Sequence, residues 1–176
     1  MKLGFPAEGV EPAPAIAEAA RAQRLKVHTG LLEEQFFPDA SFSAVTLFEV
    51  IEHLRDPAPL FAECRRILEP GGVLVVSTGN AASWTARAMK ARWDYFHVAC
   101  DAGHISFFNP DSLRLLATRC GYTVERIATA RVKFNDKGEL SRPAYLAGKL
   151  AAELLNVPAR LAAAGHDMLA WLRRPR

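Results

Sequence analysis

The chain has little of what marks a membrane, secreted or nucleic-acid-binding protein. No apolar run approaches the roughly 20 residues needed to cross a bilayer, and no signal-peptide core follows Met1. Only three residues are cysteine and no CxxC pair occurs, so a disulfide framework is not expected. The net charge is only +3, from 22 basic and 19 acidic residues. These absences predict a cytoplasmic protein with no membrane or nucleic-acid partner.

What is present is the composition of a globular domain. Half of the 176 residues are hydrophobic and 23% are charged. A chain of this length can bury a core large enough to fold without a metal or a disulfide. We expect one domain over residues 1–176, with a core at 7–130, a helical insertion at 131–165 and a closing strand at 166–174. The basic run at 173–176 is interpreted as a solvated terminus.

Hydrophobic periodicity predicts alternating strands and helices. A buried parallel strand is expected where Ala44 to Phe48 form an apolar, β-branched run between turn signals. The succession of elements indicates an α/β fold in which helices cover both faces of a mostly parallel sheet. The expected strands are 7–10, 25–28, 44–48, 73–77, 122–129 and 167–172. The expected helices are 14–23, 57–68, 81–92, 110–120, 144–156 and 158–164, with a loop at 93–103 and turns at 70–72 and 135–138.

Glu11 stands just past the end of the first expected strand. In doubly wound sheets, ligands bind outside the carboxyl ends of the strands. A carboxylate there offers enough acceptor sites to hold both hydroxyls of a ribose. The alternative is a solvated glutamate before a turn, and position alone leaves both interpretations open.

A second group of polar side chains follows the strand at 44–48. If a helical turn begins at Glu49, then Glu49, Glu52 and His53 share one face. Two carboxylates and an imidazole form half of a divalent-metal site, and His104 could add a nitrogen ligand. The alternative is structural: Glu52 and His53 would cap or brace the turn through backbone hydrogen bonds.

The remaining histidines and the aromatic residues give weaker signals. His97 has nothing to separate it from a surface histidine, and no neighbour in the sequence supports a role for His28 or His166. Aromatic residues of the second half could line a substrate pocket or pack in the core, which is their more frequent place. These residues are Trp84, Trp93, Tyr95, Phe96, Phe107 and Phe108.

In order and spacing, these segments resemble the class I S-adenosylmethionine-dependent methyltransferases. The resemblance rests on GVEP (9–12), FPDASFSAVTLFEVIEHL (37–54), LEPGGVLVVST (68–78) and HISFF (104–108), the last followed by a capped helix. The nearest branch looks like the ubiquinone-biosynthesis O-methyltransferases. The family's fold is Rossmann-like, and its closing strand resembles the segment that starts at His166.

The resemblance implies roles for particular residues. Glu11 would hold the ribose of S-adenosylmethionine, residues around Leu31 and Leu32 would flank the adenine, and Phe48 with Glu49 would line the methionine side. Some relatives hold a divalent metal such as Mg with an ExxEH motif and a later histidine. The matching metal ligands here are Glu49, Glu52, His53 and His104, of which His53 and His104 are the candidate catalytic residues.

The family's first strand and glycine-rich cofactor loop have no counterpart in the sequence, which begins near the helix before the family's second strand. We therefore expect a Rossmann-like sheet truncated at its N-terminus, with strand edges that favour a homo-oligomer. The complete form is expected to methylate a small molecule, with an oxygen as acceptor. Whether this chain is itself an enzyme stays open, because an inactive remnant acting as an interaction module is the alternative.

Overall fold

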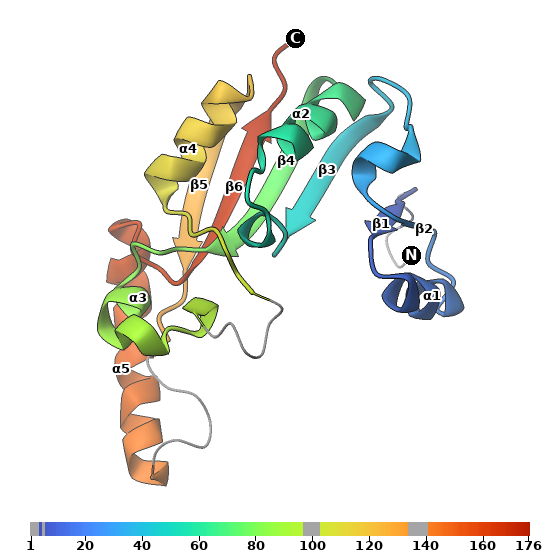
Figure 1. Ribbon diagram of the computed structural model, residues 1–176. Helices are drawn as coiled ribbons and strands as arrows, with labels where there is room; N and C mark the ends of the chain where they lie inside the picture. Colours follow the sequence, from blue (N-terminus) through green and yellow to red (C-terminus); the bar gives the residue numbers. More distant parts are fainter. Residues whose placement is uncertain (1–3, 5, 97–102, 134–140) are drawn as a thin grey trace.

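The computed structural model describes residues 4, 6–96, 103–133 and 141–176. Its centre is a sheet of four strands in the order β3 (Phe42–Phe48), β4 (Leu68–Gly79), β6 (Asp167–Arg173) and β5 (Thr123–Ala130) (Figure 1). β3 pairs in parallel with β4, and β6 lies antiparallel to both β4 and β5. Three of the four strands therefore run in the same direction. This arrangement confirms the predicted Rossmann-like α/β fold, with a mixed sheet in which one of the three strand pairings is parallel.

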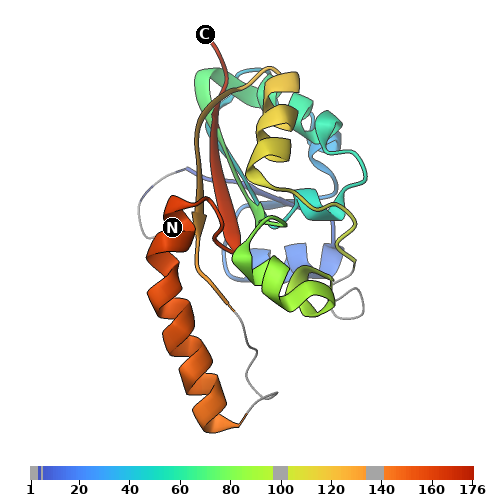
Figure 2. The ribbon, with the colours of Figure 1, turned by 90° about the vertical axis from the view of Figure 1, so that its left-hand side faces the viewer.

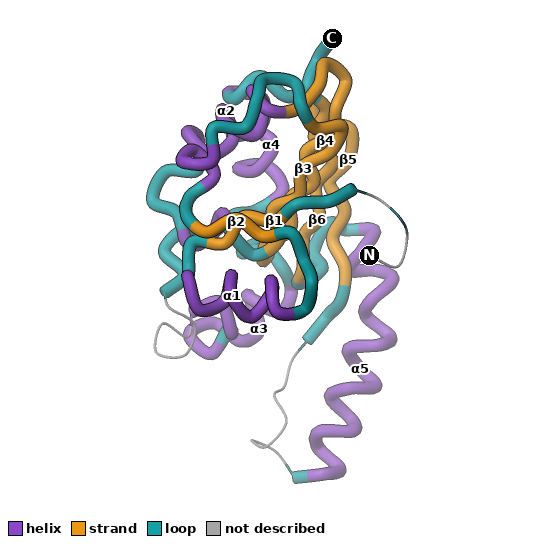
Figure 3. Tube along the Cα trace, turned by 90° about the vertical axis from the view of Figure 1, so that its right-hand side faces the viewer, coloured by secondary structure: helices purple, strands orange, loops and turns teal. Residues whose placement is uncertain are grey.

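A smaller unit precedes this sheet. β1 (Gly9–Glu11) and β2 (Val27–Thr29) pair in parallel, and α1 (Pro14–Ala22) connects them. Among the described residues they form a separate two-stranded sheet, which Figure 3 shows in front of the β3 edge. A chain of ring contacts from His28 through Phe37 to Phe42 links this unit to β3.

The core lies on one face of the four-stranded sheet. Alternate residues of β4 and β6, such as Leu74 and Leu172, are fully buried. They pack with Phe61 of α2 (Ala58–Ile67) and Leu113 of α4 (Pro110–Arg119). Figure 2 shows these two helices on one side of the sheet and α5 (Arg142–Leu161) beyond its lower end. Burial of this face accounts for most of the favourable free energy of folding.

Local sequence signals explain several element ends. Asn109 caps α4 by accepting a hydrogen bond from the N–H of Ser112, as its position before Pro110 predicts. Beyond this helix, Gly121 takes a φ of +79°. The next strand begins two residues later. The predicted helix at 110–120 and strand at 122–129 are therefore confirmed to within two residues.

Three predicted boundaries are wrong. β4 begins at Leu68 and runs through the predicted turn at 70–72, because a β-bulge between the Phe42 and Ala44 pairings, with Gly71 at a φ of +84°, absorbs the irregularity. The helix predicted at 81–92 is α3 (Trp84–Met89) followed by a 3₁₀ turn, since Asn80 Oδ1 accepts from the Ala82 N–H and Ser83 caps α3 by accepting from the Ala86 N–H. α5 is one continuous helix that contains Pro158.

The chain terminus also differs from its prediction. Arg173 lies in β6, contacts Glu125 and donates to the backbone oxygen of Gly71. Arg174 donates to three backbone oxygens at the end of α2, where the helix dipole favours a cation. These arginines therefore fasten β6 to its neighbours. Within the described residues, no helix has the length and apolarity of a membrane span.

Candidate functional site

The turn after β3 begins with a strained residue. Glu49 adopts a φ of +53°, a left-handed conformation that residues with a side chain rarely take. Its N–H bonds the backbone oxygen of Ser77 on β4. Its carboxylate accepts hydrogen bonds from the Ser77 hydroxyl at 2.9 Å and from the Tyr95 hydroxyl. The strand therefore ends in a carboxylate that faces the carboxyl end of β4.

Glu52 follows within a 3₁₀ turn over Ile51–His53, and its side chain is only 1% exposed. Oε2 accepts a hydrogen bond from Thr78 at 2.9 Å, whereas Oε1 is buried with no hydrogen-bond partner in the described part of the chain. Burial, together with the neighbouring Glu49, raises the pKa of Glu52 to about 7. Glu52 Oε1 is therefore free to carry a proton or to contact a cation.

Backbone hydrogen bonds bring the two candidate histidines together. The backbone oxygen of Glu52 accepts from the N–H groups of Ile105 and Ser106, which holds the 104–106 segment against the turn. The rings of His53 and His104 then lie 4.7 Å apart. One ligand atom each from Glu52, His53 and His104 lies within 4.8 Å of the others. The structure therefore brings together three of the four residues that the sequence predicts as metal ligands.

The tautomer of His104 suits this cluster. Its Nδ1 lies 3.1 Å from the backbone oxygen of Tyr95, which can only accept a hydrogen bond, so Nδ1 carries the proton. The other ring nitrogen is then left with a lone pair, as in histidines that ligate metals. Glu49, the fourth proposed ligand, lies beside Glu52 but has both oxygens bonded to Ser77 and Tyr95.

Tyr95 was expected only as one of several pocket aromatics, and the structure gives it a more specific place. Its ring stacks on Trp93 and His104, at centroid distances of 5.0 and 4.8 Å. A Cβ on Gly79 would lie 2.5 Å from this ring, so the absence of a side chain there lets the ring lie over β4. Burial and the Glu49 carboxylate raise the pKa of Tyr95 above its usual range, so its hydroxyl stays a donor.

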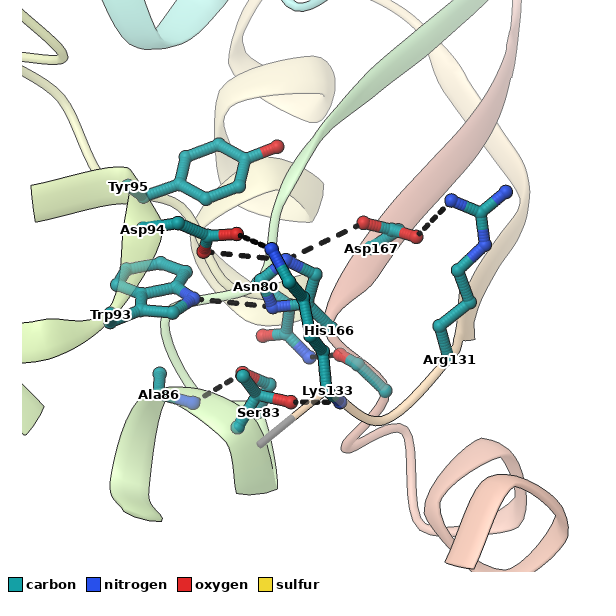
Figure 4. A network of polar contacts seen from close by, with 12 residues as sticks. Asn80, Ser83, Ala86, Trp93, Asp94, Tyr95, Arg131, Lys133, His166 and Asp167 are labelled. Carbon is teal, nitrogen blue, oxygen red and sulfur yellow. Dashed lines mark hydrogen bonds and ion pairs between the residues drawn. The ribbon is translucent and has the colours of Figure 1, made fainter. Parts of the chain in front are cut away.

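His166, which no neighbour in the sequence supports, lies in a polar network at the same edge (Figure 4). Its Nδ1 accepts a hydrogen bond from Trp93 Nε1 at 3.2 Å, so the neutral ring carries its proton on Nε2. Nε2 lies 3.5 Å from Asp94 and 3.8 Å from Asp167. Lys133 also contacts Asp94, at 2.8 Å. His166 therefore has partners in the fold that the sequence did not indicate.

Asp94 is the acidic centre of this network. Burial raises its pKa, but His166 and Lys133 outweigh burial and hold the pKa of Asp94 well below its usual value. The network fixes the segment of Trp93 and Tyr95 against the start of β6 (Figure 4). No local pattern in the sequence could have found it, because Trp93 and His166 are 73 positions apart.

The proposed cofactor residues are divided between the two sheets. Glu11 ends β1, and its Oε1 accepts a hydrogen bond from the Ala13 N–H at 2.8 Å. Leu31 is exposed and precedes a 3₁₀ turn that begins at the half-buried Leu32. Phe48 ends β3 with 58% of its surface exposed. Within the described residues, no hydrogen bond or ion pair joins Glu11 to the β3 turn.

The other aromatic residues and histidines take several places. Trp93, Phe96 and Phe107 contact one another beside Tyr95. Trp84 packs against α5, and Phe108 packs against the main core. His28 has a partner, because its Nε2 lies 2.7 Å from Glu8. His97 and Cys100 lie outside the described residues.

Comparison with known proteins supports the fold and the family. A family model described as a methyltransferase domain matches residues 2–127. A probable S-adenosylmethionine-dependent methyltransferase of Mycolicibacterium smegmatis is 51% identical over 61 residues, which are 35% of this chain and 24% of that protein. A ubiquinone biosynthesis O-methyltransferase of Bradyrhizobium is 32% identical over 93 residues, covering 50% of this chain and 36% of that protein. The chain therefore matches only about a quarter to a third of the length of these relatives.

Solved structures agree on the fold. An S-adenosylmethionine-dependent methyltransferase from Archaeoglobus fulgidus superimposes with a TM-score of 0.67 at 17% identity, covering 98% of this chain and 78% of that one. One from Thermotoga maritima gives 0.65 at 22% identity, covering 95% and 72%. At these identities the likeness shows the fold alone, while the family model spans most of the sequence. The chain belongs to the methyltransferase domain family, of the class I S-adenosylmethionine-dependent type.

Proposed function

We propose that this chain carries the cofactor and acceptor edge of an S-adenosylmethionine-dependent methyltransferase that methylates an oxygen of a small molecule. The observation that carries the proposal is the cluster of Glu52, His53 and His104 at the carboxyl ends of β3 and β4. This is the edge at which α/β sheets bind their ligands. The partial likeness to ubiquinone biosynthesis O-methyltransferases supports an oxygen acceptor.

The cofactor is expected to lie along this edge, between the ends of β1 and β3. Glu11 would accept the ribose hydroxyls, Leu31 and Leu32 would flank the adenine, and Phe48 with Glu49 would line the methionine side. Exposed apolar surface at Leu31 and Phe48 is consistent with a ligand that covers it. The catalytic contribution of these residues would be to hold the sulfonium methyl in line with the attacking oxygen.

The donor set also fits a divalent metal. Glu52 Oε1 is buried and unpartnered, and the hydrogen bond at Nδ1 directs the lone pair of His104 to the other nitrogen. One carboxylate and two imidazoles suit manganese, iron or zinc better than the magnesium expected from sequence. Such a metal supplies Lewis acidity that lowers the pKa of a substrate hydroxyl. Glu49 and Tyr95 border this position and would orient the acceptor.

The cofactor role is tested by calorimetric titration with S-adenosylmethionine and S-adenosylhomocysteine. Glu11→Gln is the sharpest variant, because an amide oxygen can still accept from Ala13 while the second carboxylate oxygen is lost. We expect micromolar affinity for both ligands, weakened about tenfold in Glu11→Gln, the cost of one charged hydrogen bond. Absence of binding by the wild-type chain would favour the interaction-module alternative.

The metal role is tested separately, by titrating Mn²⁺, Zn²⁺ and Mg²⁺ into the chelator-treated protein. Glu52→Gln removes the buried ligand, whereas Glu69→Gln removes an exposed carboxylate at the start of β4. We expect Glu52→Gln to abolish binding of the tightest ion and Glu69→Gln to leave it unchanged. Equal affinity in the two variants would eliminate this metal site without affecting the cofactor proposal.

A further inference from the structure

The helix α5 has an apolar face that nothing in the described structure covers. Five aliphatic side chains on it are 54–84% exposed. Their spacing of four, four, three and four residues places them in one stripe along the helix. The stripe consists of Leu146, Leu150, Leu154, Val157 and Leu161.

The stripe faces away from the chain's own body. α5 packs on that body through the buried Ala152 and Ala159, which contact Val132 and Trp84. Leu154 lies two positions from Ala152, and Leu161 two positions from Ala159, which is about 200° around a helix. Figures 1 and 2 show α5 projecting beyond the four-stranded sheet. An apolar stripe of this size usually marks an interaction site.

The charges beside the stripe indicate the partner. Four charged residues, Arg142, Lys149, Glu153 and Arg160, follow one of its flanks. In an antiparallel, two-fold pairing that sets Leu150 against the partner's Leu154, Lys149 lies beside the partner's Glu153, and the reverse contact forms by symmetry. A parallel pairing would place the two charged flanks on opposite sides of the seam, where Lys149 and Glu153 gain no partner across it. An anionic membrane would meet Glu153 at the middle of the flank. Arg142 and Arg160 lie at the ends of the paired segment, where salt screens their repulsion.

We propose that α5 is a dimerisation helix that pairs, antiparallel, with α5 of a second copy of this chain. The exposed leucines form the shared seam, and the reciprocal Lys149–Glu153 contacts fix its direction. This dimer does not depend on the proposed methyltransferase activity or on the metal.

Sedimentation velocity over a series of protein concentrations tests the seam. We expect a reversible monomer–dimer equilibrium for the wild-type chain. Leu154→Glu places a charge in the seam and should raise the dissociation constant more than about 100-fold, the effect of burying an unpaired charge at an interface. Leu115→Glu is the control, since Leu115 is a similarly exposed leucine on α4. Circular dichroism verifies that both variants stay folded.

A charge exchange tests the direction of pairing. Lys149→Glu and Glu153→Lys should each weaken the dimer about tenfold, because two favourable contacts become repulsive. The double variant should restore wild-type affinity. A wild-type chain that stays monomeric, or a double variant that is not restored, overturns the proposal. Binding of the monomer to phosphatidylglycerol vesicles, lost in Leu154→Glu, would overturn it in favour of a lipid surface.

Discussion

The β1–α1–β2 unit and the four-stranded sheet obey the same local rules but differ in burial. In the unit, strands of three residues pair in parallel, and among the described residues only Ala17 is a buried hydrophobic residue. In the four-stranded sheet, strands of 7 to 12 residues present fully buried side chains to α2 and α4. Strands and helices therefore form in both regions, but most of the buried apolar surface that stabilises the fold lies against the four-stranded sheet.

This difference matters for function because each region holds part of the proposed site. The proposed metal ligands and Tyr95 lie at the edge of the strongly buried sheet, whereas Glu11 lies on the weakly buried unit. We expect the metal-binding edge to be rigid in the free protein and the ribose-binding edge to become ordered when the cofactor binds.

The largest difference in the free energy of unfolding is expected when one glycine in each region is replaced by alanine. A Cβ at Gly165 would lie 2.5–2.8 Å from backbone atoms of Ala130 on β5, which cannot move aside. Gly165→Ala should therefore lower the free energy of unfolding by about 3 kcal/mol. At Gly9 on β1 the atom nearest to an added Cβ is a Val27 methyl at 3.4 Å. Gly9→Ala should therefore change the free energy of unfolding by less than about 0.5 kcal/mol. Urea unfolding measures both, and equal losses would contradict the comparison.

The second prediction concerns the buried carboxyl of Glu52. Its pKa of about 7 in the folded state lies above its ordinary value of 4.5. The stability that this group contributes is complete below pH 4.5 and is lost as pH rises to about 7. Glu52→Gln should match the wild-type free energy of unfolding at pH 4.5 and exceed it at pH 8 by at most about 3 kcal/mol. Urea unfolding of the chelated protein at both pH values measures this, and a destabilised variant at pH 8 would contradict it.

A third, smaller effect is expected at Asp94, whose pKa is held low by His166 and Lys133. A carboxyl with a lowered pKa contributes stability above its ordinary pKa of 3.8, and this contribution is lost as pH falls below that value. Asp94→Asn should cost about 1–2 kcal/mol at pH 7 and less near pH 3. Thermal unfolding followed by tryptophan fluorescence can compare the two pH values. A cost that is constant with pH would rule out the ionic contribution.

The smallest effect is expected within the weaker unit. Arg21 of α1 donates hydrogen bonds to the Val27 backbone oxygen and to the Thr29 hydroxyl of β2, at 3.0 and 2.9 Å. Arg21→Ala should make local opening of β2 easier by about 0.5–1 kcal/mol without changing global unfolding. Hydrogen exchange should show faster exchange at the β2 amides and no change at those of β4. A change at β4 would mean that the two regions unfold together.

Prediction from sequence worked best where a signal is local. The strand before Phe48 and the capped helix after Asn109 were found because apolar periodicity and caps act over a few residues. The predicted start of β4 was wrong, because a bulge between the Phe42 and Ala44 pairings lets the strand begin at Leu68. Prediction from sequence also missed the contacts of His166, whose partners come from distant segments.

The α/β succession, the family resemblance and the residue types at the end of β3 can all be predicted from the amino-acid sequence. Apolar spacing and helix caps act within one or two turns of chain, so one sequence contains them in full. Three properties become visible only in the folded chain. His104 contacts His53, Glu52 is buried with no hydrogen-bond partner for Oε1 among the described residues, and the leucines of α5 are exposed. These properties depend on which distant surfaces pack together and exclude water, and no local pattern specifies that packing.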